Sequence, residues 1–227
     1  MILALPTQCA VCRDWSAQRV CGACRGRHAA LVPRCTGCAI RVPAGVGRCG
    51  GCLVSPLPFA TAVAAVDYRF PWSHLVTALK FHAALDLATP MAALLADAVR
   101  AQDQALPERL LPVPLGRSRL AERGLNQAWE LARRVAQELG CRAEAHALLR
   151  RVDTPHLADL PRESRAQAIR GAFALAPGAA TALRGRTLAL VDDVMTTGAT
   201  AAEAARTLLA AGAASVQLWV FARTPAP

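Results

Sequence analysis

Four cysteine pairs of the form Cys-x-x-Cys crowd the first 52 residues of this 227-residue chain. The pairs are Cys9 and Cys12, Cys21 and Cys24, Cys35 and Cys38, and Cys49 and Cys52. Two residues between cysteines allow a tight turn to point both sulfurs at one metal ion, and two such turns complete a tetrahedron. The segment is otherwise rich in glycine and arginine, so metal bonds must supply its folding energy. We therefore expect two structural zinc ions, each with four thiolate ligands and no open position.

Disulfide bonds and an iron–sulfur cluster are the alternatives to zinc. Disulfides need an oxidising compartment, and the first eight residues have neither the basic start nor the apolar run of a signal peptide. A cluster would accept four cysteines, but evenly spaced pairs are more typical of zinc knuckles. These observations favour zinc and a cytoplasmic location. Sequential, nested and interleaved pairing of the four turns all stay open.

The charge of the chain favours polyanionic ligands. Its 26 basic residues, of which Lys80 is the only lysine, outweigh 16 acidic ones and give a formal charge of +10. Eight zinc-bound thiolates would lower this value to about +6, which is still basic. A biased genomic base composition is the alternative origin of the arginine excess. No apolar run reaches the roughly 18 residues of a transmembrane helix, so we expect no membrane span.

Hydrophobic patterning after the cysteines predicts an α/β domain. Pro56 and Pro58 mark a boundary, which gives a zinc-ribbon domain over 1–55 and a second domain over 56–227. Apolar periodicity predicts strands at 60–68, 110–113, 146–152, 186–192 and 215–222, helices at 73–81, 86–100, 126–139 and 200–211, and a mobile loop at 154–170. A strand followed by a helix and another strand is typical of a parallel sheet flanked by helices.

The segment 188–200, LALVDDVMTTGAT, carries the strongest chemical signal. Four apolar residues predict a buried strand that ends in Asp192 and Asp193, and a hydroxyl-rich turn then opens a helix. Backbone N–H groups and hydroxyls of the turn suit a phosphate, and paired carboxylates suit the vicinal hydroxyls of a ribose. The turn comprises Thr196, Thr197, Gly198, Ala199 and Thr200. The alternative is that the acids start a turn and Thr200 caps a helix.

This string resembles the phosphoribosyl pyrophosphate motif of type I phosphoribosyltransferases, and further segments are similar to the ComF/GntX family. These are PVPLGRSRLAERGLNQA at 112–128, the LKF segment around Lys80, the central loop at 149–173 and the cysteine pairs. The resemblance implies a type I phosphoribosyltransferase-like, Rossmann-type sheet behind a double zinc ribbon. It also implies a link to natural competence and to the handling of single-stranded DNA.

The resemblance assigns roles to individual residues. Asp192 and Asp193 would hold the ribose hydroxyls, and residues 196–200 would hold the 5-phosphate. Arg117 and Arg119, in the loop after the strand at 110–113, would bind pyrophosphate, because guanidinium groups neutralise a leaving group that gains charge. Mg²⁺ would arrive with the phosphoribosyl pyrophosphate.

One difference from the phosphoribosyltransferases that act on 6-oxopurines narrows the range of possible acceptor molecules. Those enzymes usually carry a third acid where this chain has Thr196, and threonine is no general base at neutral pH. Hypoxanthine or guanine salvage is therefore disfavoured. Lys80 is a candidate ligand contact or a surface lysine, and His82 and His156 are weak candidates for proton transfer.

Two functions stay open at this point. The first is a Mg²⁺-dependent phosphoribosyltransferase of unknown acceptor, linked to DNA uptake or nucleotide metabolism. The second is a non-catalytic adaptor that handles single-stranded DNA together with competence-machinery proteins.

Overall fold

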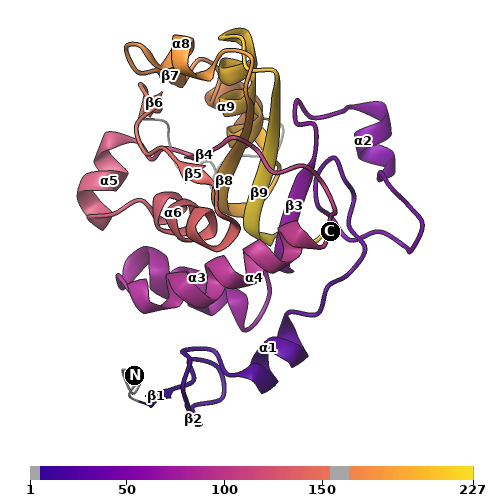
Figure 1. Ribbon diagram of the computed structural model, residues 1–227, viewed down its shortest axis with the longest axis vertical. Coiled ribbons are helices and arrows are strands. Elements are labelled where there is room, and N and C mark those ends of the chain that lie inside the picture. The colour runs from indigo at the N-terminus through magenta and orange to yellow at the C-terminus, as the bar shows by residue number, and fades with distance from the viewer. Residues whose placement is uncertain (1–5, 154–163, 227) are drawn as a thin grey trace.

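The protein, seen here as a computed structural model that describes residues 6–153 and 164–226, is built around a five-stranded sheet (Figure 1). The strand order is β3-β9-β8-β4-β5, and every neighbouring pair is parallel. The strands are β3 (Ala62–Asp67), β4 (Arg109–Pro112), β5 (Arg142–Ala143), β8 (Thr187–Met195) and β9 (Ser215–Arg223). The predicted α/β class with a parallel sheet is confirmed.

Helices cover both faces of the sheet. One face carries α3 (Trp72–Phe81), α4 (Ala88–Arg100) and α6 (Gln127–Leu139), and the other carries α9 (Ala199–Ala210). Side chains of a strand alternate between faces. Ala189 and Val191 of β8 accordingly join the core under α3, α4 and α6, whereas Leu188 and Leu190 join the core under α9. Burial on both faces explains the continuous apolar runs of β8 and β9.

The long helix α6 shows how sequence signals set element ends. Asn126 precedes it, and its side chain accepts a hydrogen bond from the Ala128 N–H at 3.0 Å. Gly140 ends it in a left-handed conformation, with φ of 68°. Leu131 and Val135 are fully buried. The predicted helix at 126–139 is therefore confirmed.

Smaller elements outside the main sheet correct several predictions. A separate antiparallel pair joins β6 (Leu148–Arg150) to β7 (Phe173–Leu175), so the strand expected at 146–152 is short and lies outside the main sheet. Further short helices in the described part of the chain are α5 (Arg117–Arg123), α7 (Ser164–Ala168) and α8 (Ala179–Leu183). The prediction of a mobile loop at 154–170 is wrong for residues 164–168, which form α7. Residues 154–163 of the expected loop lie outside the described part of the chain.

Other predicted elements differ in detail. The strands at 60–68 and 215–222 and the helices at 73–81 and 200–211 are confirmed within two residues at each end. The helix expected from residue 86 begins with a separate 3₁₀ turn, η1 (Leu85–Leu87). The strand expected to end at Asp192 continues through Met195, because Asp192 and Val194 still pair with β9. Among the described residues, no helix is long and apolar enough to cross a membrane.

The cysteine-rich segment wraps around the edge strand β3. Its first half holds β1 (Thr7–Gln8), β2 (Trp15–Ser16) and α1 (Gly22–His28), and lies beside α3 and α4 (Figure 1). Its second half holds α2 (Gly50–Val54) and packs on the opposite side of β3, in the core shared with α9. The domain boundary at residue 55 stays a prediction.

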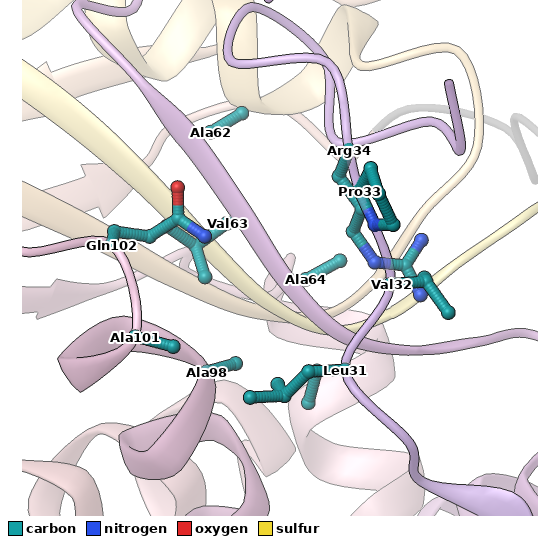
Figure 2. A pocket seen from close by; sticks show the side chains of 11 residues that line it. Leu31, Val32, Pro33, Arg34, Ala62, Val63, Ala64, Ala98, Ala101 and Gln102 are labelled. Carbon is teal, nitrogen blue, oxygen red and sulfur yellow. The ribbon is translucent and has the colours of Figure 1, made fainter. Parts of the chain in front are cut away.

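A cavity of about 320 Å³ lies along β3 where the connection between the two halves passes (Figure 2). Its walls are the connection at 31–34, the strand residues 62–65 and the end of α4. Arg34 in this wall forms an ion pair of 2.9 Å with Asp67, and both side chains are more than nine-tenths buried. The connection is therefore fastened to the sheet.

Candidate functional site

The direction of the chain through the sheet places a crevice between β4 and β8. From β4 the chain moves outward to β5, and from β8 it moves the other way to β9. The helix α6, which follows β4, and the helix α9, which follows β8, cover opposite faces. Open α/β sheets bind ligands at such a switch point, outside the carboxyl ends of the strands.

A cavity of about 370 Å³ occupies this crevice, and many of the described residues around it are charged or carry a hydroxyl group. Its charged and hydroxyl-bearing lining residues are Tyr68, Thr77, Lys80, Arg119, Arg123, Arg150, Asp192, Asp193, Thr196 and Thr200. Four of these side chains are cationic and two are carboxylates. The cavity therefore suits an anionic, hydroxyl-rich ligand.

The two adjacent carboxylates have different surroundings. Asp193 is 7% exposed and faces the α3 side of β8, whereas Asp192 is partly exposed. Asp192 accepts a hydrogen bond from the Asp193 N–H at 2.8 Å and borders both this cavity and the threonine turn. Burial, reinforced by the Asp193 carboxylate, raises the pKa of Asp192 to about 8. A ligand that supplies a cation or hydroxyl donors would favour its charged form.

Lys80 belongs to the site and is no surface lysine. Its Nζ lies 2.9 Å from Oδ2 of Asp193, and its side chain is 21% exposed. Burial works against the ammonium charge, but attraction to Asp193 outweighs it and raises the pKa of Lys80. Lys80 therefore stays charged and fixes one carboxylate of the pair.

The threonine turn forms a second, smaller hollow next to the cavity. It has a volume of about 60 Å³ and is lined by Asp192, Val194 and residues 195–201. Gly198 is the N-cap of α9 and adopts a left-handed φ of 82°. The Thr197 hydroxyl accepts a hydrogen bond from the Ala199 N–H at 3.4 Å. The turn thus places the free N–H end of a twelve-residue helix beside Asp192.

The structure separates the two arginines expected to bind pyrophosphate. Both lie on helix α5, not in a loop as the sequence predicted. Arg119 lines the polar cavity, whereas Arg117 is exposed and lines a neighbouring cavity. Arg123 and Arg150 also line the polar cavity, which the sequence did not predict.

The arginines at this site lie close enough to repel one another. Burial, together with the positive charge of Arg119, lowers the pKa of Arg150. The Arg123 guanidinium lies over the Phe81 ring, 4.9 Å from its centroid. Cations held together in this way gain from an anion between them.

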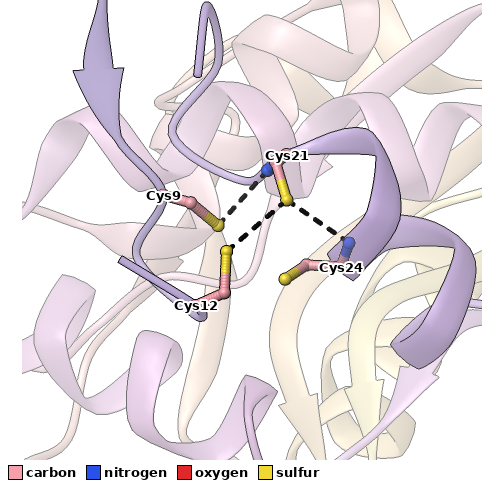
Figure 3. Close-up of side chains that lie close together, drawn as sticks. All are labelled: Cys9, Cys12, Cys21 and Cys24. Atoms are coloured by element: carbon pink, nitrogen blue, oxygen red, sulfur yellow. Dashed lines mark hydrogen bonds between the residues drawn. The ribbon is translucent and has the colours of Figure 1, made fainter. Parts of the chain in front are cut away.

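The cysteines form two tetrads in sequential order. The sulfurs of Cys9, Cys12, Cys21 and Cys24 lie within 4.8 Å of one another, and so do those of Cys35, Cys38, Cys49 and Cys52. Cys12 Sγ and Cys21 Sγ are 3.8 Å apart (Figure 3), and Cys38 Sγ and Cys49 Sγ are 3.6 Å apart. Sulfurs about 2.3 Å from one tetrahedral ion would be about 3.8 Å apart. The two tetrads could therefore hold two zinc ions.

Backbone donors prepare one sulfur of each tetrad for metal binding, namely that of Cys9 and that of Cys35. Cys9 Sγ accepts hydrogen bonds from the N–H groups of Val11 and Cys21, and Cys35 Sγ accepts one from Cys49. Burial opposes ionisation, but such donors lower the pKa of Cys9 to about 6 and that of Cys35 to about 7. Thiolates are the form that binds zinc. The ninth cysteine, Cys141, is partly buried and lies apart from both tetrads.

The residues that sequence reasoning missed come from distant segments. Arg150 belongs to β6, and Arg123 ends α5, so neither lies in the segment 188–200. The sequence did offer one indication of both residues, because each lies in a segment that resembles the ComF/GntX family. His82 is exposed and is not among the described residues that line the cavity, and His156 lies outside the described residues.

Comparisons with known proteins show relatives over nearly the whole chain. It is 34% identical over 233 residues to DNA utilization protein YhgH of Escherichia coli O6:H1, which covers 98% of this chain and 100% of that protein. It is 34% identical over 160 residues to competence protein F of Haemophilus influenzae, with 69% of each chain covered. No family model matches the chain.

Solved structures resemble the chain more distantly. One is a glutamine phosphoribosylpyrophosphate amidotransferase from B. subtilis, complexed with ADP and GMP, with a TM-score of 0.40, 18% identity, and coverage of 60% of this chain and 27% of that one. Another is the protein TT1426 from Thermus thermophilus, with a TM-score of 0.36, 21% identity, and coverage of 59% and 72%. The fold class itself follows from the strand order described above.

Proposed function

The chain belongs to the ComF-like family of DNA utilization protein YhgH and competence protein F, and from this premise we propose that it binds phosphoribosyl pyrophosphate with Mg²⁺ in support of DNA utilisation. The observation that carries the proposal is one cavity in which a carboxylate pair, a threonine turn and several guanidinium groups face a common space. Phosphoribosyl pyrophosphate has a matching group for each of these three parts: its ribose hydroxyls for the carboxylates, its 5-phosphate for the threonine turn, and its pyrophosphate for the guanidinium groups.

Each part of the ligand has a corresponding wall. Asp192 and Asp193 accept hydrogen bonds from the ribose hydroxyls, and residues 196–200 hold the 5-phosphate at the start of α9. Arg119, joined by Arg150, holds the pyrophosphate and neutralises the charge that it gains on departure. Mg²⁺ arrives with the pyrophosphate, and the carboxylate oxygens beside it are donors of the kind that this ion prefers.

Isothermal titration with phosphoribosyl pyrophosphate and Mg²⁺ tests the proposal. Asp192→Asn is expected to weaken binding of both phosphoribosyl pyrophosphate and ribose 5-phosphate. Arg119→Gln is expected to weaken binding of phosphoribosyl pyrophosphate roughly tenfold, because a charged hydrogen bond contributes about 1.5–3 kcal/mol. It should leave binding of ribose 5-phosphate unchanged, since that ligand has no pyrophosphate. Matched controls are Asp103→Asn, which changes an exposed acid after α4, and Arg142→Gln, which changes a residue of β5 at the amino ends of the strands, away from the cavity. Absence of binding at millimolar ligand would refute the proposal.

The link to DNA rests on the names of the relatives and on the basic charge of the chain. The adaptor function predicts salt-dependent binding of single-stranded DNA. A strain that carries Asp192→Asn distinguishes the two functions. Loss of DNA utilisation with intact DNA binding supports a role for the sugar phosphate, whereas unimpaired utilisation supports the adaptor.

A further inference from the structure

A second cavity of about 820 Å³ adjoins the proposed sugar phosphate site. It lies between α5, the start of α6 and β6. The two cavities share four lining residues, namely Pro114, Leu115, Asn126 and Arg150. A molecule in the second cavity would therefore lie against a ligand in the first.

The second cavity offers an apolar surface with an aromatic ring. Trp129 of α6 lines it, together with Leu120 and Leu149, which are 45% and 39% exposed. Large apolar side chains left open to solvent in a hollow mark a place where a ligand can bury surface. A flat ring could stack on Trp129 and cover both leucines.

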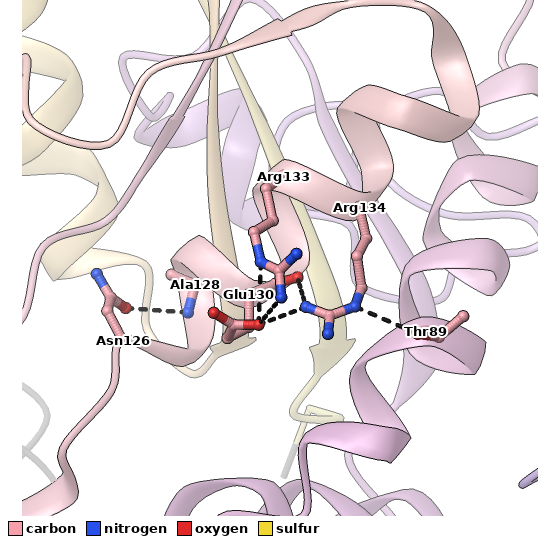
Figure 4. Close-up of polar contacts among 6 residues, drawn as sticks. All are labelled: Thr89, Asn126, Ala128, Glu130, Arg133 and Arg134. Atoms are coloured by element: carbon pink, nitrogen blue, oxygen red, sulfur yellow. Dashed lines mark hydrogen bonds and ion pairs between the residues drawn. The ribbon is translucent and has the colours of Figure 1, made fainter.

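The charge of this cavity is positive. Arg117, Arg150 and Arg151 line it, and Glu130 is the one acid among its described lining residues. Glu130 is already engaged, because the Arg133 Nη2 donates to its carboxylate at 2.6 Å and Arg134 also donates to it (Figure 4). Burial opposes ionisation of Glu130, but the hydrogen bonds from Arg133 and Arg134 lower its pKa. The acid therefore stays paired, and the remaining arginines favour an anionic ligand.

We propose that this second cavity holds the acceptor of the phosphoribosyl group, and that the acceptor is a planar aromatic molecule bearing a carboxylate or a phosphate. This inference rests on the proposed function, since it places the acceptor beside the ribose. The ring lies on Trp129, and its anionic group meets Arg117 and Arg151. In the transfer, the bond from ribose C1 to the pyrophosphate oxygen breaks and its electron pair leaves with pyrophosphate. A nitrogen of the acceptor forms the new bond to C1, and its proton passes to the released pyrophosphate.

Two small probes test the chemistry of the cavity. 2-Aminobenzoate supplies the aromatic carboxylate and phenyl phosphate the aromatic phosphate, and aniline is the neutral control. Each is titrated into the full chain with and without saturating ribose 5-phosphate and Mg²⁺, which keeps phenyl phosphate out of the threonine turn. We expect one or both anionic probes to bind at least about tenfold more tightly than aniline. The stronger probe identifies the acceptor's anionic group.

Variants then separate this inference from the proposed function. Arg151→Gln changes one exposed side chain and is expected to weaken the anionic probe roughly tenfold while leaving phosphoribosyl pyrophosphate binding within twofold. Trp129→Leu should weaken both the anionic and the neutral probe. Arg142→Gln should change neither. Failure of both anionic probes to bind, or binding of the anionic probe that is unchanged in Arg151→Gln, overturns the inference. Failure of phosphoribosyl pyrophosphate alone to bind refutes the proposed function.

Discussion

At the scale of single residues, Asp192, Asp193 and Lys80 show how one site can hold two carboxylates. Lys80 pairs with Asp193 and leaves Asp192 to face the cavity. Burial and the neighbouring Asp193 carboxylate raise the pKa of Asp192, and the charge of Lys80 only partly offsets them. This arrangement keeps Asp192 available for a ligand that brings its own donors.

The raised pKa of Asp192 makes the stability of the ligand-free protein depend on pH. The folded carboxyl has a pKa of about 8, against 3.8 for an ordinary one, so between these values the folded state binds a proton that the unfolded state lacks. The free energy of unfolding therefore falls as pH rises towards 8. Urea unfolding should show Asp192→Asn more stable than the parent by about 1–2 kcal/mol at pH 8.5, and by less at pH 5. A difference that does not change with pH would contradict this, and Asp103→Asn is the control.

Gly198 is required by its backbone conformation, and a side chain at this position would also displace the end of Met195. Its φ of 82° disfavours other residues, and an added Cβ would lie 2.5 Å from Met195 Cε and 3.4 Å from Leu57 Cδ1. Gly198→Ala should lower the free energy of unfolding by about 1–3 kcal/mol. Gly185→Ala is a matched control, because Gly185 has a φ of 70° with no atom near its Cβ position. Equal losses in the two variants would show that the contacts at Gly198 are unimportant.

At the scale of elements, each cysteine tetrad is a separate unit with its own place on the molecule. The first is joined to α3 by a hydrogen bond of 2.7 Å from Trp72 Nε1 to the carbonyl of His28. The second is joined to β9 by a hydrogen bond of 2.8 Å from Arg223 Nε to the carbonyl of Cys38. Loss of one metal should therefore loosen one side of the protein and spare the other.

Metal counting tests this separation. Cys12→Ser should lower the zinc content from two ions per chain to one, because three ligands hold the ion far less tightly than four. Cys38→Ser should have the same effect on the other tetrad. Cys141→Ser should retain both ions, since Cys141 lies in neither tetrad. Elemental analysis of the purified proteins gives the count, and two ions in Cys12→Ser would contradict the assignment.

At the scale of the whole molecule, buried charges fasten the cysteine-rich segment to the sheet. Asp67, at the end of β3, forms ion pairs with Arg34 and Arg41, and the pair with Arg34 is almost fully buried. A buried ion pair costs desolvation when it forms, but removal of one partner leaves the other charge uncompensated. The fold therefore depends on this contact between distant parts of the chain.

A double-mutant cycle measures the contact. Asp67→Asn should lower the free energy of unfolding by about 3–5 kcal/mol, because it leaves Arg34 buried without its carboxylate. Arg34→Met combined with Asp67→Asn should recover part of that loss, since no buried charge then remains at Arg34. Urea unfolding of both single variants and the double variant gives the coupling energy. Additive losses would show that the two residues act independently.

Local sequence accounted for the parts of the fold that depend on short-range patterns. The segment 188–200 could be identified as strand, turn and helix because a continuous apolar run, Gly198 and the helix periodicity all act within a few residues. The exact end of β8 could not be predicted, because pairing with β9 decides how far a strand continues. The same reason explains why the strand expected at 146–152 is shorter in the structure, where pairing with β7 limits β6 to three residues.

The cavity depended on contacts that no local pattern specifies. Arg150 reaches the site because β6 pairs with β7, and Lys80 reaches Asp193 because α3 packs on the sheet. Whether Arg117 or Arg119 faces the polar cavity depends on the helical turn of α5, where residues two apart point in different directions.

The amino-acid sequence by itself predicted cysteine clusters suited to metal, a parallel α/β sheet, and a strand–turn–helix unit of the kind that suits a phosphate. These follow from ligand spacing and hydrophobic period, which act between near neighbours along the chain. The tertiary structure alone decided which cysteines lie together in a tetrad, which cations line the cavity beside Asp192 and where the second cavity opens. Those depend on long-range packing, since side chains distant in sequence meet only when helices and strands find their places on the sheet.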